Sequence, residues 1–291
     1  MMFKGSMIPI VTPLKEGKID EEGFQNLIEF HIKSGTDAII PCGTTGESAT
    51  LTHKEHEQLV EICIKTVNHR VPVIAGTGSN STDEAIKLTT YAQKAGADGA
   101  LLITPYYNKP TQEGLYQHYK NIAAKTDIPL ILYNVPSRTG VNMLPETVAK
   151  LSEIPTIVGI KEASGSLPQI CEIIYLCGEK CSVFSGDDFV NYPILAMGGR
   201  GIISVTANIV PDKIAAMWDA FESGDQTKAR DIHYQLLSLN NAMFLETNPI
   251  PVKTALGLMG KISPEMRLPL SPMSQNNLEK LKKVMAKYKL I

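Results

Sequence analysis

The sequence lacks the long apolar run and the excess of one charge that mark membrane proteins and nucleic-acid-binding proteins. Its 291 residues carry a formal net charge of −2, so no basic field exists to attract nucleic acid or an anionic membrane. No apolar stretch approaches the roughly eighteen residues that a membrane span needs. We therefore expect neither nucleic acid nor a membrane as a partner.

The cysteines are few and form no recognisable pattern. There are five, an odd number, and none belongs to a C-x-x-C pair, so neither a disulfide framework nor a thiol redox motif is indicated. The first residues lead into an apolar segment without the charged and apolar regions of a secretory signal. We therefore expect a cytoplasmic protein with reduced, mostly buried cysteines, namely Cys42, Cys63, Cys171, Cys177 and Cys181.

Cofactor and metal motifs are also missing. Gly76-Thr77-Gly78 resembles the start of a dinucleotide-binding loop but lacks its third glycine, and it is better interpreted as leading into a helix. His53 and His56 are not in the H-E-x-x-H order of a zinc protease, and no third ligand is nearby in the sequence. The sequence thus gives no reason to expect a metal ion or an organic cofactor.

What the sequence does contain is a regular alternation of apolar runs and segments with helical periodicity. Hydrophobic residues make up 43% of the chain and charged residues 20%, as in folded globular proteins. The eight strand-like runs span residues 7–11, 37–40, 71–75, 99–103, 129–133, 156–160, 181–184 and 201–205. Eight such units predict an α/β fold, a closed (β/α)8 TIM barrel over residues 1–224.

The last part of the chain has a different pattern. Helical periodicity without intervening strands covers residues 225–245, 251–259 and 275–288. We therefore expect a C-terminal all-helical region over residues 225–291. Earlier in the chain, Asp20, Ser81 and Pro145 stand where helices of the barrel are expected to begin.

One charged residue is unusual in this pattern. Lys161 follows the sixth apolar run, where a strand buried on both faces would remove its ammonium group from water. An unperturbed lysine is almost wholly protonated at pH 7, but a desolvated one can form a Schiff base with a carbonyl compound. Taken alone, Lys161 is better explained as a side chain that reaches solvent or pairs with Glu162.

Polar residues follow the predicted strands at the end where barrel active sites lie. The residues expected to meet there with Lys161 are Thr44, Thr45, Tyr106, Tyr107, Tyr133 and Arg138. Tyr133 can exchange a proton through the Thr44 hydroxyl, while threonine hydroxyls and Arg138 can hold carboxylates. Each could instead be a turn residue, an interface aromatic or a surface ion pair, but those interpretations leave their shared position unexplained. The set predicts the joining of a 2-oxo acid to another acidic carbonyl compound.

Three stretches in combination resemble one family: Gly43-Thr44-Thr45-Gly46-Glu47, residues 133–140, and Lys161-Glu162-Ala163-Ser164-Gly165. Over essentially the whole chain, the sequence resembles the 4-hydroxy-tetrahydrodipicolinate (dihydrodipicolinate) synthase family of pyruvate-dependent Schiff-base lyases and aldolases. The resemblance implies a lyase that condenses pyruvate with L-aspartate 4-semialdehyde, the first committed step of diaminopimelate and L-lysine biosynthesis. It also implies a homotetramer made of two tight dimers, with no cofactor.

The same resemblance implies a role for each site residue. The residues similar to the catalytic ones are Lys161 for the pyruvate imine, and Tyr133, Thr44 and Tyr107 for proton relay. Those similar to the binding ones are Thr45 for the pyruvate carboxylate, Arg138 for the semialdehyde carboxylate, and the backbone at Gly186 and Ile203. Tyr107 would come from the neighbouring subunit.

A further implication of the resemblance concerns regulation. Lysine-inhibited members bind L-lysine at the tight-dimer interface. The residues at similar positions here are Ser48, Ala49, His53, His56, Asn80, Glu84 and Tyr106. Glu84 would receive the ammonium group of the effector, and Asn80 and Tyr106 its carboxylate. We therefore expect feedback inhibition by L-lysine; the alternative is a capped helix with exposed histidines.

Two other functions stay open at this point. One is a different class I aldolase on the same barrel, such as an N-acetylneuraminate lyase or a 2-oxo-3-deoxy sugar acid aldolase. Arg138 and the paired threonines favour a small acidic aldehyde over a polyhydroxylated sugar. The other is a non-catalytic barrel that binds an amino acid as a regulator, in which Lys161 would form no imine.

Overall fold

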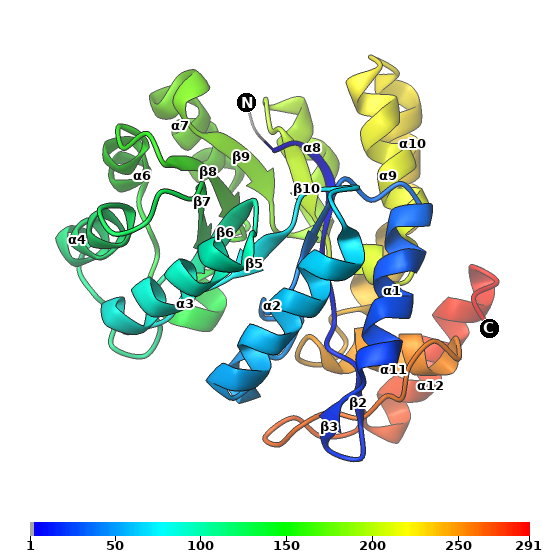
Figure 1. The fold of residues 1–291 in the computed structure, drawn as a ribbon. Coiled ribbons are helices and arrows are strands. Elements are labelled where there is room, and N and C mark those ends of the chain that lie inside the picture. The colour runs from blue at the N-terminus through cyan, green and yellow to red at the C-terminus, as the bar shows by residue number, and fades with distance from the viewer. Residues whose placement is uncertain (1–2) are drawn as a thin grey trace.

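The predicted barrel is present in the computed structural model, which describes residues 3–291. Eight parallel strands pair in the order β4–β1–β10–β9–β8–β7–β6–β5. A bridge between Ile39 and Val73 closes the sheet between β4 and β5. The strands are β1 (Gly5–Pro9), β4 (Ala38–Ile40), β5 (Ile74–Gly76), β6 (Gly99–Ile103), β7 (Leu130–Asn134), β8 (Ile157–Glu162), β9 (Ser182–Ser185) and β10 (Gly201–Ile203). The expected (β/α)8 barrel is confirmed (Figure 1).

Helices follow the strands and lie on the outside of the barrel (Figure 1). They are α1 (Glu21–Lys33), α2 (His53–Val67), α3 (Thr82–Ala95), α4 (Gln112–Ala123), α5 (Pro136–Thr139), α6 (Pro145–Ser152), α7 (Leu167–Cys177), α8 (Asn191–Ala196) and α9 (Pro211–Glu222). The predicted start signals are confirmed, because Asp20 and Ser81 cap α1 and α3 through their side chains and Pro145 is the first residue of α6.

The C-terminal region is helical, as predicted. It contains α10 (Gln226–Ala242), α11 (Ile250–Leu258) and α12 (Gln275–Lys287). Leu236, Val252 and Leu281 from these helices are buried in one hydrophobic cluster with Ile28 of α1 and Val60 of α2. In Figure 1, α11 and α12 lie beside the lower end of α1. The region is therefore packed against the barrel, while its division from the barrel at residue 225 stays a prediction.

The structure differs from the predicted strands in length and in one added hairpin. The first apolar run continues to Val11, but β1 ends at Pro9, although Ile10 and Val11 are fully buried. An apolar run marks burial, whereas a strand ends where its hydrogen-bonded ladder ends. A short hairpin, β2 (Leu14–Lys15) and β3 (Lys18–Ile19), was not predicted, because two-residue strands are too short to show a period.

The alternation of side chains along the strands determines which residues face the barrel interior. In β7, Ile131 and Tyr133 belong to the cluster inside the barrel, while Leu130 and Leu132 pack in the cluster that includes the outer helices. Successive residues of a strand point to opposite faces. Lys161 of β8 is in register with Tyr133, so both point into the barrel, near the carboxyl ends of their strands.

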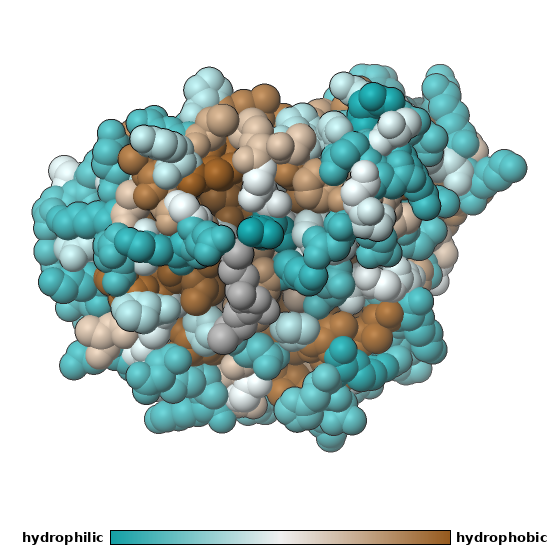
Figure 2. Space-filling view, turned by 90° about the horizontal axis from the view of Figure 1, so that it is seen from above, coloured by the Kyte–Doolittle hydropathy of each residue, from teal (hydrophilic) through white to brown (hydrophobic). Residues whose placement is uncertain are grey.

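The surface shows no membrane-spanning element in the part of the chain that the structure describes. Across residues 3–291, none of the helices combines the length and hydrophobicity needed to cross a bilayer. The face seen from above in Figure 2 carries mostly hydrophilic side chains, with smaller hydrophobic areas between them.

Candidate active site

Lys161 and Tyr133 form the centre of the candidate site. The Lys161 Nζ atom lies 4.3 Å from the centroid of the Tyr133 ring, and the two side chains come from adjacent strands in register. Only 5% of Lys161 and 7% of Tyr133 is exposed. The predicted burial of Lys161 at the end of its strand is thus present in the structure.

Burial changes the protonation of Lys161. Desolvation lowers the pKa of its amine to about 7; the Asp188 carboxylate opposes the shift and the Arg138 guanidinium adds to it. The amine is therefore neutral at pH 7 far more often than that of an ordinary lysine. The side chain also needs space, because a Cβ atom at Gly186 would lie 2.9 Å from the Lys161 Cε atom. Glycine at position 186 thus leaves room for the amine.

Thr44 joins the site through Tyr133. Its side chain hydrogen-bonds the Tyr133 phenol, and this bond lowers the tyrosine pKa while burial, the larger effect, raises it. The phenol is therefore protonated at neutral pH and can donate a proton to a neighbouring group. The expected pairing of a tyrosine with a threonine hydroxyl is thus formed inside one chain.

Two further groups are suited to anions. The Thr45 hydroxyl oxygen accepts a 3.0 Å hydrogen bond from Asn248 Nδ2, so its own hydrogen is free to donate elsewhere. The Arg138 Nη2 atom donates to the Asn248 carbonyl at 3.0 Å, and within residues 3–291 Arg138 makes no ion pair. The remaining guanidinium donors are therefore available for a carboxylate.

A cavity of about 280 Å³ connects these groups. Its lining includes Lys161, Tyr133, Thr44, Thr45, Arg138, Gly186 and Asn248. Ile203, which was also expected at the pyruvate pocket, is buried in β10 and belongs to the hydrophobic cluster inside the barrel. The structure therefore brings together six of the eight residues expected for catalysis and substrate binding.

Tyr107 is the other exception. Its side chain is 89% exposed, and its backbone has a φ of 72°, a conformation that is uncommon for residues other than glycine. Within the single chain, Tyr107 faces solvent rather than Lys161. Its expected role in a neighbouring subunit stays a prediction.

The residues expected to bind an effector line a second cavity of about 420 Å³. They are Ser48, Ala49, His53, His56, Glu84 and Tyr106. Asn80, the seventh, donates from its side chain to the Tyr106 carbonyl at 3.1 Å. Thr44, Tyr133 and Arg138 line both cavities, so the candidate effector site and the candidate active site adjoin each other within one chain.

Several polar groups of the second cavity already have hydrogen-bond partners within the chain. His53 Nε2 lies 2.8 Å from Glu84 Oε1, and hydrogen bonds from the Ser79 hydroxyl and His53 hold the Glu84 pKa below its usual value. His56 is buried, with Nε2 2.7 Å from the Gly76 carbonyl, and burial lowers its pKa. Of the two histidines, only His53 is exposed. Glu84 is thus an ionised carboxylate at neutral pH.

Asn248 is the functional residue that the sequence analysis missed. It contacts both Thr45 and Arg138, yet it lies just before α11, outside the eight strands. A search limited to strand ends could not find it. The sequence signal that was present is Asn248-Pro249-Ile250-Pro251, a proline-rich break between two helical segments.

The fold and the site define a class of protein, namely a (β/α)8 barrel with a desolvated lysine at the carboxyl end of a strand. The dihydrodipicolinate synthetase family model matches residues 2–288. The chain therefore belongs to the dihydrodipicolinate synthetase family.

Individual relatives agree with this assignment. The 4-hydroxy-tetrahydrodipicolinate synthase of Thermodesulfovibrio yellowstonii is 65% identical over 290 residues, which cover 100% of both chains. The crystal structure of dihydrodipicolinate synthase from Aquifex aeolicus is 50% identical, with a TM-score of 0.97 and 99% of each chain covered.

Two further solved structures contain a bound molecule. The chloride-inhibited dihydrodipicolinate synthase of Acinetobacter baumannii, complexed with pyruvate, is 47% identical, with a TM-score of 0.97 and 99% of each chain covered. The Cyanidioschyzon merolae enzyme with lysine bound is 40% identical, with a TM-score of 0.96, 100% of this chain and 99% of the other covered.

Proposed function

We propose that this protein is a lyase that condenses pyruvate with L-aspartate 4-semialdehyde to give 4-hydroxy-tetrahydrodipicolinate, in diaminopimelate and L-lysine biosynthesis. The observation that carries the proposal is Lys161, a buried amine with a pKa of about 7 that faces a cavity lined by carboxylate-binding groups. Full-length relatives named as this synthase, at up to 65% identity, support the choice of substrates.

The first half of the reaction forms an imine at Lys161. Pyruvate enters with its carboxylate at the Thr45 hydroxyl, which is oriented by Asn248. The neutral Lys161 amine attacks the ketone carbon, and water leaves to give a protonated imine. Loss of a methyl proton then gives an enamine, a carbon nucleophile.

The Tyr133 phenol moves the protons of these steps. It lies beside the Lys161 amine and is hydrogen-bonded by the Thr44 hydroxyl. The phenol can donate a proton to the departing oxygen and take one back through Thr44. Tyr107 of a neighbouring subunit would complete this relay.

The second half joins the two substrates. Arg138 holds the carboxylate of L-aspartate 4-semialdehyde, so the aldehyde carbon lies within reach of the enamine. Carbon–carbon bond formation leaves a hydroxyl group and restores an imine. The amino group of the second substrate then attacks the imine carbon, closes the ring and releases Lys161 as a free amine.

Borohydride trapping tests this proposal. Incubation with pyruvate and sodium borohydride should reduce the imine and attach the pyruvate carbons to Lys161, as peptide mass spectrometry would show. Lys253, which is also buried, is an internal control that should stay unlabelled. Lys161→Ala should neither be labelled nor turn over. A wild-type chain that acquires no label would point instead to a barrel that only binds a ligand.

We also propose that L-lysine inhibits the enzyme through the larger cavity. The Glu84 carboxylate is suited to the effector's ammonium group, and Asn80 and Tyr106 lie together beside it. The lysine-bound relative from Cyanidioschyzon merolae supports an effector of this kind. Because the two cavities share Thr44 and Tyr133, an occupied effector site could act directly on the proton relay.

For the assembly we propose a homotetramer of two tight dimers. The exposed Tyr107, which stands outside its own active site, supports a dimer in which it reaches the neighbouring active site.

We propose that the protein is cytoplasmic. A reducing compartment suits its five free cysteines, of which Cys177 and Cys181 are hydrogen-bonded neighbours without a disulfide.

A further inference from the structure

Glu47 has an uncommon backbone conformation in the turn that follows β4. Its φ of 57° and ψ of 34° place it in the left-handed region, which residues other than glycine seldom adopt. Its backbone N–H donates to the Thr44 carbonyl at 3.1 Å, and the Ser48 N–H donates to the Gly43 carbonyl at 3.3 Å. The conformation of Glu47 is thus coupled directly to the position of Thr44 and its neighbour Thr45.

The Glu47 side chain is held from the C-terminal region. Its Oε1 atom lies 2.5 Å from Lys253 Nζ in α11, and its Oε2 atom accepts the Arg267 backbone N–H at 3.2 Å. The Lys253 and Glu47 side chains are 0% and 2% exposed. Burial lowers the Lys253 pKa, while the Glu47 carboxylate raises it. Both partners are thus enclosed by protein.

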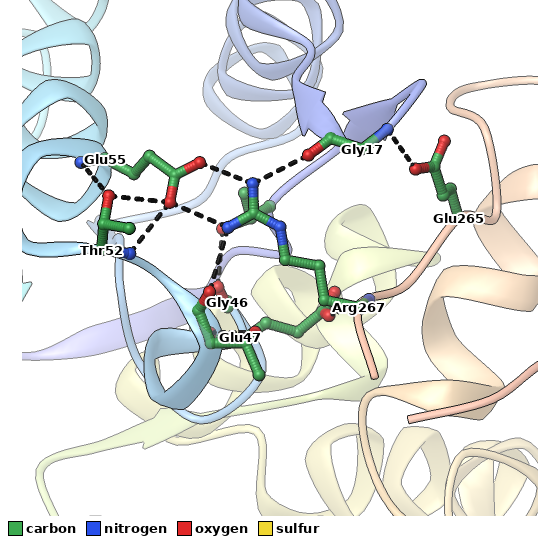
Figure 3. Close-up of polar contacts among 9 residues, drawn as sticks. Gly17, Gly46, Glu47, Thr52, Glu55, Glu265 and Arg267 are labelled. Atoms are coloured by element: carbon green, nitrogen blue, oxygen red, sulfur yellow. Dashed lines mark hydrogen bonds and ion pairs between the residues drawn. The ribbon is translucent and has the colours of Figure 1, made fainter. Parts of the chain in front are cut away.

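Arg267 fastens the same segment to the start of α2. Its guanidinium group pairs with Glu55, which lies within the capping box at Thr52, and donates to the Thr50 and Gly17 carbonyls (Figure 3). Figure 3 also shows Glu47 beside Arg267. The turn that contains Glu47 is therefore held between α2 and the C-terminal region.

A buried ion pair is a costly way to gain stability. Replacing such a pair with apolar residues is often neutral or stabilising, because removing two charges from water costs about as much as their attraction returns. The pair has a different effect that apolar side chains could not reproduce, namely that it fixes one conformation of the turn. An apolar side chain at position 253 would leave the Glu47 Oε1 atom without this partner.

We propose that Lys253 is a positioning residue: its ion pair with Glu47 fixes the turn from Gly43 to Ser48 and thereby the threonines that receive pyruvate. The inference rests on the proposed function, because it gives Lys253 a task in the same reaction. Lys253 acts from the C-terminal helices, without touching the substrate. Asn248, five residues earlier, holds Thr45 from the same segment.

The test compares three variants with a matched control. Lys253→Met removes the ammonium group, Glu47→Gln removes the negative charge but keeps the side-chain shape, and the double variant removes both charges. Leu281→Ala is the control, because it empties a buried site in α12 of the same region without touching the turn. For each protein, the melting temperature, kcat and the KM for pyruvate are measured.

We expect Lys253→Met to lower the melting temperature and to raise the pyruvate KM by about 10- to 100-fold, because the threonines lose their fixed position. Glu47→Gln should raise the pyruvate KM less than Lys253→Met does. The double variant should regain thermal stability, since no lone charge stays buried, but keep a raised KM. Leu281→Ala should lose stability with an unchanged KM. If Lys253→Met fails to fold, the pyruvate KM of the double variant is compared with that of the wild type instead.

Two outcomes would overturn the proposal. One is an unchanged pyruvate KM in Lys253→Met and the double variant; the other is a KM that simply follows the melting temperature across all four proteins. Either would make the pair structural only. Failure of the proposed function would look different, because wild-type Lys161 would then acquire no borohydride label with pyruvate.

Discussion

At the scale of single residues, burial and two charged neighbours set the pKa of Lys161. Burial lowers its pKa, and the positive charge of Arg138 lowers it further, whereas Asp188 raises it. An amine whose folded pKa lies below its unfolded value costs stability at low pH, and this cost fades as pH rises from about 7 toward 10.5. The burial that lowers the pKa of Lys161 therefore also lowers the free energy of unfolding near neutral pH.

The rate of borohydride trapping should therefore depend on pH in a particular way. Only the neutral amine attacks pyruvate, so the trapping rate should rise with pH and level off above a midpoint near 7. Arg138→Met removes a positive charge that lowers the pKa, so its midpoint should move to higher pH. The measurement is the labelling rate between about pH 5.5 and 11.5, a range chosen to bracket both the shifted and the ordinary lysine pKa. A wild-type midpoint near 10 would contradict the desolvated lysine.

The sequence was sufficient to predict the buried lysine and tyrosine of the candidate site but not the C-terminal residues that contact the turn after β4. Lys161 and Tyr133 could be found because each ends an apolar run, and both are buried as expected. Asn248, just before α11, and Lys253, within it, lie some two hundred residues after Thr45 and Glu47. Contacts at such a separation depend on how the C-terminal helices dock, and no local pattern records that.

At the scale of elements, a polar bridge on the outer side of β7 and β8 fixes the register that aligns the site. Asn134 and Glu162 are the pair after Tyr133 and Lys161, and their side chains point away from the barrel interior. Asn134 Nδ2 donates to Glu162 Oε1 at 2.6 Å, and the Ser164 hydroxyl donates to Oε2 at 2.7 Å. Glu162 is fully buried, and burial raises its pKa. It therefore does not form the ion pair with Lys161 that the sequence left open.

Removing this bridge should destabilise the barrel. Asn134→Ala leaves the buried Glu162 oxygen without its partner, which should cost about 1–3 kcal/mol in the free energy of unfolding. Denaturation in urea measures this cost. Asn121→Ala is a suitable control, because Asn121 makes a similar hydrogen bond to Gln117 on the surface. Equal losses in the two variants would show that the bridge has no special role.

Strand boundaries and the short hairpin were the parts of the fold that could not be predicted in detail. The eight runs were found because a barrel strand is buried on both faces and is therefore apolar throughout. Residues such as Ile10 and Val11 are equally buried beyond the strand end, so composition cannot mark where pairing stops. The hairpin turn at Glu16 and Gly17 has a positive φ at both residues, a local signal too short to be decisive.

Helices α2 and α3 provide three residues of the proposed effector site, His53, His56 and Glu84, and this leads to a second prediction at this scale. L-lysine at millimolar concentration should lower the steady-state rate, because its ammonium group binds Glu84. Glu84→Gln should weaken the inhibition about 10-fold or more, since a charge-assisted hydrogen bond is lost. The measurement is the ratio of rates with and without L-lysine for each protein. Rates that do not respond to L-lysine in the wild-type enzyme would rule out the effector site.

At the scale of the whole molecule, the C-terminal helices and the barrel form a single functional unit. Asn248 contacts Thr45 and Arg138, and Lys253 contacts Glu47, so two loops of the barrel mouth, after β4 and after β7, are held by one C-terminal segment. Among the four residues expected for catalysis, Tyr107, which is 89% exposed, is the one that the fold of residues 3–291 does not bring to the cavity with Lys161.

Subunit mixing distinguishes a Tyr107 that serves its own site from one that serves its neighbour. Lys161→Ala and Tyr107→Phe proteins should each be nearly inactive. In a mixed dimer, the Tyr107→Phe subunit keeps its lysine and receives an intact tyrosine from the Lys161→Ala subunit, so one complete site forms. Random mixing should restore about a quarter of wild-type activity, since half of the dimers are mixed and each has one working site. If Tyr107 acts within its own chain, no subunit of the mixed dimer holds both residues, and mixing restores nothing.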